Sequence, residues 1–211
     1  MEAVLDTSGA RGFGLWPTAA RPVDGLLPLS GRLSGAETGT ALAVLALYNK
    51  GERRRGARDP EDAGELIRRF STVRSVVAPG GLRLKDTATG VTVSPGCCSG
   101  LEDWRDWLGP ANGEKLWLGH DPTPLVEHMG AIVRLWPDGD TATGPSIDVP
   151  RDRIPQLLGS VREELVGFLD RVESWAADRV PSAAAALRAR LDEDWTVSAP
   201  LPEVPARTPR R

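Results

Sequence analysis

The hydrophobic pattern is most regular in the last third of the chain. From Pro155 onward, seven large apolar side chains recur at intervals of three and four residues, the spacing of one α-helical face. These residues are Leu158, Val161, Leu165, Phe168, Leu169, Val172 and Trp175. A second stripe follows Pro181, where Leu187, Leu191 and Trp195 lie four residues apart. The pattern predicts two amphipathic helices at this end of the chain.

Two further helices are predicted nearer the N-terminus. The continuous apolar run 41–48 is rich in Ala and Leu, which favours a buried helix over about 36–48. Asp59 can cap a second helix and Pro60 can occupy its first position, where its fixed φ angle is suitable. The apolar stripe that follows consists of Ala63, Leu66, Ile67 and Phe70. It predicts a helix over about 60–70.

Short strands are predicted between these helices. Alternating side chains at 82–84 and 91–93, with a turn at Thr89-Gly90, are typical of a hairpin with one buried face. Residues 131–136 are rich in β-forming side chains, and 146–149 supply a candidate partner strand. The intervening segments are too irregular for repeated βαβ units. The expected fold class is therefore α+β, with a small antiparallel sheet of about four strands packed against several helices.

The two ends of the chain differ from its middle. Residues 1–39 carry seven Gly and three Pro with little periodicity, which predicts an irregular N-terminal arm. Four prolines fall within residues 196–211 and predict an extended Pro-rich C-terminal tail. Residues 40–195 between them are expected to form a single α+β domain.

Charge and apolar content narrow the possible partners and compartment. The 26 basic and 29 acidic residues give a net charge of −3, without the basic footprint typical of nucleic-acid binding. The longest apolar run is far shorter than the roughly 18 residues of a membrane span. The first residues are acidic where a signal peptide is basic, and the two adjacent cysteines form no disulfide framework. We expect a cytoplasmic protein that binds neither nucleic acid nor a membrane.

Residues 94–136 contain the densest candidate chemistry, including both Cys, both His and four of the seven Trp. Ser99 and Glu102 have the spacing of a capping box, which predicts a helix that begins there. Cys97 and Cys98 would then lie just before a helix N-terminus, where the backbone amides favour a thiolate. With His120 as the base, these cysteines are the candidate catalytic residues of a thiol-dependent enzyme. The competing interpretation, which we prefer, is that one or both of them are small buried hydrophobes.

A metal site is a further alternative for the same segment. Cys97, Cys98, His120 and His128 are suitable ligand types, but adjacent cysteines lack the two-residue gap that lets a zinc knuckle wrap its ion. His128 has apolar neighbours in the sequence and is expected to be a partly covered structural side chain. The sequence therefore predicts no metal ion and no other cofactor.

The segment 119–124 is predicted to be a rigid turn. Asp121 and Thr123 each precede a proline, which favours extended backbone conformations. Such a turn could present His120 and Asp121 beside Trp117 as a recognition loop. It could equally be a tight connector in which Asp121 bonds its own backbone.

Two tryptophans on the predicted helix bear on the same surface. Trp104 and Trp107 are three residues apart, so on an α-helix they cannot both lie at the centre of one narrow buried stripe. We assign Trp107 to the core and Trp104 to the surface. The candidate binding residues are therefore Trp104, Trp117, His120 and Asp121.

Common catalytic motifs are absent from the sequence. It contains no Walker loop, G-x-S-x-G elbow or H-E-x-x-H helix. A small sheet followed by an amphipathic helix with Phe168-Leu169 and Trp175 resembles small bacterial α+β immunity proteins, over the latter half of the chain. The enrichment in Trp beside a rigid loop, together with the lack of a catalytic motif, indicates a protein partner. The leading hypothesis is a non-catalytic, cytosolic protein-binding protein of the immunity or regulatory type, and the alternative is the thiol-dependent enzyme.

Overall fold

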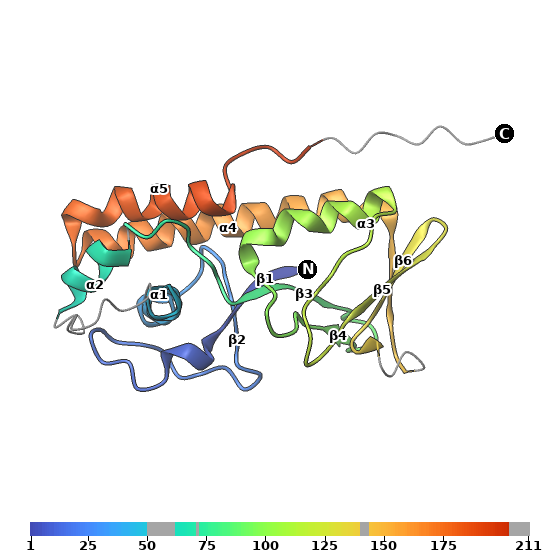
Figure 1. Ribbon diagram of the computed structural model, residues 1–211, viewed down its shortest axis with the longest axis horizontal. Coiled ribbons are helices and arrows are strands. Elements are labelled where there is room, and N and C mark those ends of the chain that lie inside the picture. Colours follow the sequence, from blue (N-terminus) through green and yellow to red (C-terminus); the bar gives the residue numbers. More distant parts are fainter. Residues whose placement is uncertain (50–61, 71, 140–143, 203–211) are drawn as a thin grey trace.

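The computed structural model describes the chain in four stretches: 1–49, 62–70, 72–139 and 144–202. Two long helices, α4 (Ile154–Ala177) and α5 (Ala184–Trp195), lie side by side along one side of the molecule (Figure 1). A four-stranded and a three-stranded antiparallel sheet complete the fold. The predicted α+β class is confirmed.

The first sheet has the strand order β2-β1-β3-β4, with every neighbouring pair antiparallel. Its strands are β1 (Glu2–Asp6), β2 (Leu26–Pro28), β3 (Gly80–Lys85) and β4 (Thr92–Val93). Strands β3 and β4 pair with Leu84 opposite Val93, which confirms the predicted hairpin.

Residues 1–39 are not the irregular arm that the sequence predicted. They supply β1 and β2, and β1 lies between β2 and β3 in the sheet. Ala3, Val4 and Leu5 are all buried. A strand covered on both faces needs no polar alternation, so its pattern resembles that of an aperiodic segment. Trp16, between β1 and β2, is bonded to the helix that begins at Gly35, because its indole N–H donates to the carbonyl of Gly39 at 2.7 Å.

The second sheet has the order β5-β6-β7. Its strands are β5 (Leu125–Met129), β6 (Ile132–Trp136) and β7 (Ile147–Pro150). Pairing of β6 with β7 confirms the prediction for residues 131–136 and 146–149. Strand β5 was missed because none of its side chains is buried, so it shows no alternation.

The two predicted N-terminal helices are confirmed as α1 (Gly35–Tyr48) and α2 (Ala63–Phe70). The start signal predicted for α2 at 59–61 lies outside the described residues. Helix α1 is buried through most of its length, which explains its continuous apolar pattern. A capping box begins it, in which the Glu37 N–H donates to Ser34 Oγ and the Ser34 N–H donates to the Glu37 carboxylate.

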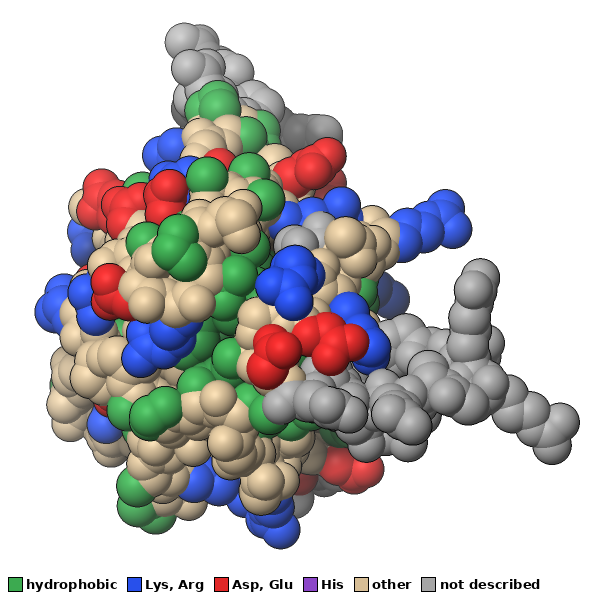
Figure 2. Space-filling model, turned by 90° about the vertical axis from the view of Figure 1, so that its left-hand side faces the viewer, with side chains coloured by type: hydrophobic (Ala, Val, Ile, Leu, Met, Phe, Trp, Pro, Cys, Tyr) green, Lys and Arg blue, Asp and Glu red, His purple; other side chains and the backbone are tan. Residues whose placement is uncertain are grey.

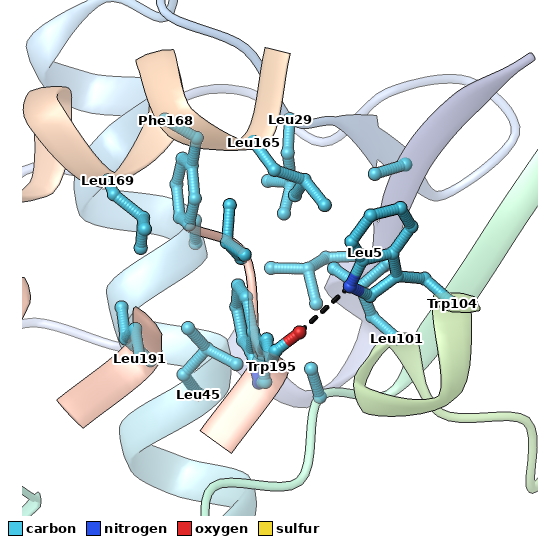
Figure 3. Packing of buried hydrophobic residues seen from close by; sticks show 14 of the residues in the cluster. Leu5, Leu29, Leu45, Leu101, Trp104, Leu165, Phe168, Leu169, Leu191 and Trp195 are labelled. Atoms are coloured by element: carbon cyan, nitrogen blue, oxygen red, sulfur yellow. Dashed lines mark hydrogen bonds between the residues drawn. The ribbon is translucent and has the colours of Figure 1, made fainter. Parts of the chain in front are cut away.

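The core forms where α4 and α5 pack over β1 and α1 (Figure 3). All seven residues of the predicted stripe on α4 are buried, as are Leu187 and Leu191 on α5. Trp195 stacks on Phe168 with 6.2 Å between ring centroids, and its carbonyl accepts the indole N–H of Trp104 at 2.9 Å. Three-residue 3-10 helices precede α4 and α5, at Arg151–Arg153 and Pro181–Ala183.

The described part of the predicted C-terminal tail, 196–202, is irregular but held to the body. Val197 is fully buried. Arg105 donates to the carbonyls of Thr196, Ala199 and Pro200, and Arg162 donates to those of Val197, Ser198 and Ala199. Residues 203–211 lie outside the described part of the chain.

Within the described stretches, no helix combines the length and hydropathy needed to cross a bilayer. Basic and acidic side chains are intermixed on the face in Figure 2. That face therefore offers no continuous basic stripe to a nucleic acid.

Candidate functional site

The helix next to the cysteines differs from the predicted one. It is a 3-10 helix, Leu101–Trp107, continued by α3 (Leu108–Asn112) and ended by Gly113 at φ 90°. The predicted capping box is wrong, because the cap residue is Gly100 and no side chain caps the helix. The Glu102 carboxylate instead accepts the backbone N–H of Ala78 at 2.8 Å. A Gly-Pro pair such as Gly109-Pro110 is expected to end a helix, but both residues lie within α3.

The 3-10 geometry also corrects the prediction for Trp104. A 3-10 helix has three residues per turn, so side chains at positions i and i+3 share one face. Leu101, Trp104 and Trp107 therefore all face the core, with Trp104 only 1% exposed and Trp107 4% exposed. Trp104 is a buried core residue and is removed from the candidate binding surface.

Burial of Glu102 predicts a pH dependence of stability. Desolvation raises the pKa of this carboxyl above its ordinary value of 4.5, and the hydrogen bond from Ala78 opposes the shift. The folded state thus retains the proton more readily than the unfolded state, so the contribution of Glu102 to stability falls as pH rises through the ordinary pKa towards the raised one. Urea unfolding at a series of pH values should show wild type losing stability relative to Glu102→Gln over this range. If the unfolding free energy of wild type relative to Glu102→Gln stayed constant or rose with pH, the assignment would be wrong.

The centre of the candidate site is a backbone bridge between Cys97 and His120. The two residues exchange N–H···O=C hydrogen bonds in both directions, as an antiparallel pair does. The Gly96 N–H adds a bond to the carbonyl of Leu118 at 2.7 Å. Side chains of directly opposed residues project on the same face of such a pair. The bridge therefore places the Cys97 thiol beside the His120 imidazole.

Two glycines permit this close approach. A Cβ atom on Gly119 would lie 2.5 Å from the carbonyl oxygen of Cys97, and one on Gly96 would lie 2.2 Å from that of Pro122. Both distances are too short for any side chain. Gly119 also has a φ of +94°, a conformation that favours glycine. The two strands of the site are thus held at a separation that only glycine allows.

This packing predicts the effect of Gly119→Ala. The new methyl group would meet backbone rather than a flexible side chain, and its φ is unfavourable, so we expect a loss of roughly 1–3 kcal/mol in unfolding free energy. Gly130→Ala is the matched control, because Gly130 has a φ of +67° but no atom within 4 Å of its Cβ position. Urea unfolding of both variants measures the difference. Equal losses would show that the tight contact at Gly119 contributes nothing.

Cys98 joins the site through an unusual backbone conformation. Successive side chains normally point to opposite faces of an extended strand. Cys98 departs from this alternation with a φ of 64°, and its Sγ lies 3.6 Å from the Sγ of Cys97. Asp121, after His120, also has a positive φ of 52°. Two of the three non-glycine residues with positive φ in the described chain therefore belong to this site, and such conformations cluster at functional sites.

The three ligand-type side chains converge. One ligand atom from each of Cys97, Cys98 and His120 lies within 4.8 Å of the other two. The hydrogen bond between the thiols, and the charge on Cys97, raise the pKa of Cys98. Cys98 therefore keeps its thiol proton to a higher pH than an isolated cysteine would. A metal ion that binds both thiolates would replace that proton.

The preferred interpretation of the cysteines as buried hydrophobes is wrong, because both are exposed. The side chains of His120 and Asp121 are 50% and 92% exposed, and His120 Nδ1 lies 3.2 Å from a carboxylate oxygen of Asp121. Asp121 is not in the extended conformation predicted for it. Its carboxylate contacts the neighbouring imidazole, and the recognition loop stays a prediction.

His128 does not belong to the cluster. It lies on β5, where Nε2 is 2.8 Å from the carbonyl oxygen of Glu114. It is exposed rather than partly covered as predicted, because β5 is the edge strand of the second sheet. The four-ligand set considered from the sequence is therefore reduced to three.

A cavity of about 530 Å³ is lined in part by residues that are close in sequence to the cluster. Ser99 and Leu118, which line it, are close sequence neighbours of Cys98 and His120. Asp103 also lines it, and burial, with a smaller contribution from the charge of Asp106, raises the pKa of Asp103. The thiols themselves do not line this cavity.

Trp117 is the one predicted binding tryptophan that the fold leaves on the surface. Its side chain is 63% exposed and forms part of the cavity wall. It is three residues before His120, so an exposed aromatic side chain lies close in the chain to the thiol–imidazole cluster.

Only the tertiary structure brings these side chains together. The separation of 23 residues between Cys97 and His120 has no characteristic meaning. The glycine directly before each of them, Gly96 and Gly119, is the only local signal of close backbone approach. Comparison of the chain with protein-family models, curated proteins and solved structures found no match.

Proposed function

We propose that this protein binds a soft divalent metal ion, with Zn²⁺ as the first candidate, through Cys97, Cys98 and His120. The observation that carries the proposal is the convergence of two thiols and an imidazole within 4.8 Å. Thiolate and imidazole are ligands that Zn²⁺ commonly takes in proteins.

The spacing of the sulfur atoms supports a shared ion. Two thiolates bound to one tetrahedral Zn²⁺ at about 2.3 Å each are about 3.8 Å apart. The two Sγ atoms are 3.6 Å apart before any ion is considered. The adjacent cysteines, which argued against a zinc knuckle, therefore have a usable separation once Cys98 adopts a positive φ.

A thiol-dependent enzyme is supported less well by the same cluster. Catalytic cysteines work as thiolates and usually have a lowered pKa. The pKa of Cys98 is raised instead, and its neighbour is a second thiol rather than a cation. The two thiols also do not line the neighbouring cavity, where a substrate would be enclosed.

Titration with Co²⁺ under reducing conditions tests the proposal directly. Binding to two thiolates is expected to produce strong thiolate-to-cobalt charge-transfer absorption that saturates at one equivalent, and Zn²⁺ should then displace the Co²⁺ and remove the band. Elemental analysis of the purified protein provides an independent count of bound metal. Absence of the band together with metal-free protein would refute the proposal.

A protein-binding surface is the second candidate function. Trp117 favours it, since exposed tryptophans are enriched at binding hot spots and this one adjoins His120 and Asp121. Trp117→Ala is expected to weaken binding to any partner recovered by pull-down by about 2 kcal/mol or more. Val23→Ala changes another exposed apolar side chain and is the control. Equal binding by wild type and Trp117→Ala would eliminate this surface.

A further inference from the structure

We propose that the metal site is an open one, with three protein ligands, a histidine oriented by Asp121, and a fourth position available to a sulfur or nitrogen donor from outside the protein. This inference rests on the proposed metal binding and adds how the site is organised. It assigns Asp121 as a positioning residue rather than a ligand.

The contact between Asp121 and His120 supports the first part. A metal-bound histidine commonly donates its other ring N–H to a carboxylate or carbonyl oxygen, which fixes its tautomer and raises its basicity. His120 Nδ1 faces the carboxylate of Asp121 at 3.2 Å. With the proton on Nδ1, Nε2 is the nitrogen that carries a free lone pair for an ion. Asp121 therefore occupies the outer position of a carboxylate–histidine–metal arrangement.

The ligand count supports the second part. Within the described residues, the Cys97, Cys98 and His120 group contains no further His, Cys, Asp or Glu side chain. The other histidine, His128, is held by the carbonyl of Glu114. Structural zinc sites have four protein ligands, whereas sites with three keep a position for water or an external donor.

Exposure makes that position reachable. Both cysteines are exposed, and half of the His120 side chain is open to solvent. Two thiolates and a neutral imidazole balance the charge of a divalent ion. The loaded site therefore has no net charge that would repel an anionic donor, and it can also accept a neutral one. A small thiol or an imidazole is the class of donor that suits an ion already held by sulfur and nitrogen.

Cobalt-loaded protein provides the test of the open position. Addition of imidazole, and separately of 2-mercaptoethanol, is expected to change the cobalt d–d spectrum in a saturable way with one donor per ion. A spectrum that neither probe alters would overturn the open position. A protein that binds no metal would instead overturn the proposed function itself, so the two failures are distinguishable.

Variants at position 121 test the positioning role. Glycine tolerates the φ of this residue, so Asp121→Gly removes the carboxylate without backbone strain. We expect it to weaken Zn²⁺ binding by about 10–100-fold. Asp121→Asn, whose amide oxygen can still accept the N–H, should restore part of that loss. Asp152→Asn changes another exposed carboxylate and is the control.

The tautomer of His120 is a readout that a purely structural role would not change. In long-range proton–nitrogen NMR spectra of the zinc-loaded protein, His120 should be protonated at Nδ1 and bound through Nε2. If Asp121→Gly kept both the wild-type affinity and this pattern, or if the wild type bound through Nδ1, Asp121 would have no positioning role.

Discussion

The double variant Cys97→Ser/Cys98→Ser is expected to lose zinc binding while keeping its fold. A hydroxyl is a far poorer ligand than a thiolate for a soft ion, so a single remaining imidazole would bind Zn²⁺ only weakly. Affinity should fall by at least about 100-fold, more than the loss typical of an outer-shell change. Competition with a chromophoric zinc chelator measures this directly.

Exposure is the reason that the fold should survive this change. Both cysteines are exposed, and surface substitutions usually alter stability by less than about 0.5 kcal/mol. His128→Ala is the matched control, since it removes an exposed histidine that lies outside the cluster. If the double variant bound Zn²⁺ as tightly as wild type, or if His128→Ala lost as much affinity, the ligand assignment would be wrong.

Trp195→Ala should cause the largest loss of stability among single changes in the core. Trp195 is fully buried, stacks on Phe168, and donates its indole N–H to the carbonyl of Val76 at 3.2 Å. Its removal leaves a large cavity beside Phe168 and takes away the donor to the Val76 carbonyl. Truncation of a buried Trp typically costs about 3–5 kcal/mol in unfolding free energy.

Trp117→Ala is the matched control for this prediction. It deletes the same side chain at a position that is 63% exposed, so we expect a loss of less than about 0.5 kcal/mol. Urea unfolding followed by far-ultraviolet circular dichroism compares the two without depending on tryptophan fluorescence. Similar losses for the two variants would contradict the packing in Figure 3.

The structure reverses the roles that the sequence predicted for Trp104 and for the two cysteines of the segment 94–136. From the sequence, Trp104 and Trp117 were expected on the surface and the cysteines in the core. The fold buries Trp104 and exposes both cysteines. The preferred candidate site is consequently the thiol–imidazole cluster rather than an aromatic surface, and Trp117 is its exposed neighbour in the sequence.

The sequence alone determined two kinds of element: helices that bury one face or are buried throughout, and strands that bury one face. The stripe of α4 and the apolar run of α1 were predicted correctly, because a helix that packs on a core repeats its apolar positions or is apolar throughout. The β3–β4 hairpin was also predicted, because its strands alternate. These patterns are local in the sequence, so they can be recognised without knowing which part of the fold each element packs against.

Tertiary structure decided the elements and contacts that have no local period. Strand β1 is covered on both faces, and β5 has no buried side chain, so neither alternates. The 3-10 helix Leu101–Trp107 reversed the prediction for Trp104, because three residues per turn rather than 3.6 place it on the buried face. Cys97 and His120 meet only because two glycines allow a backbone bridge between distant segments. Residue types were therefore visible in the sequence, and their convergence depended on the fold.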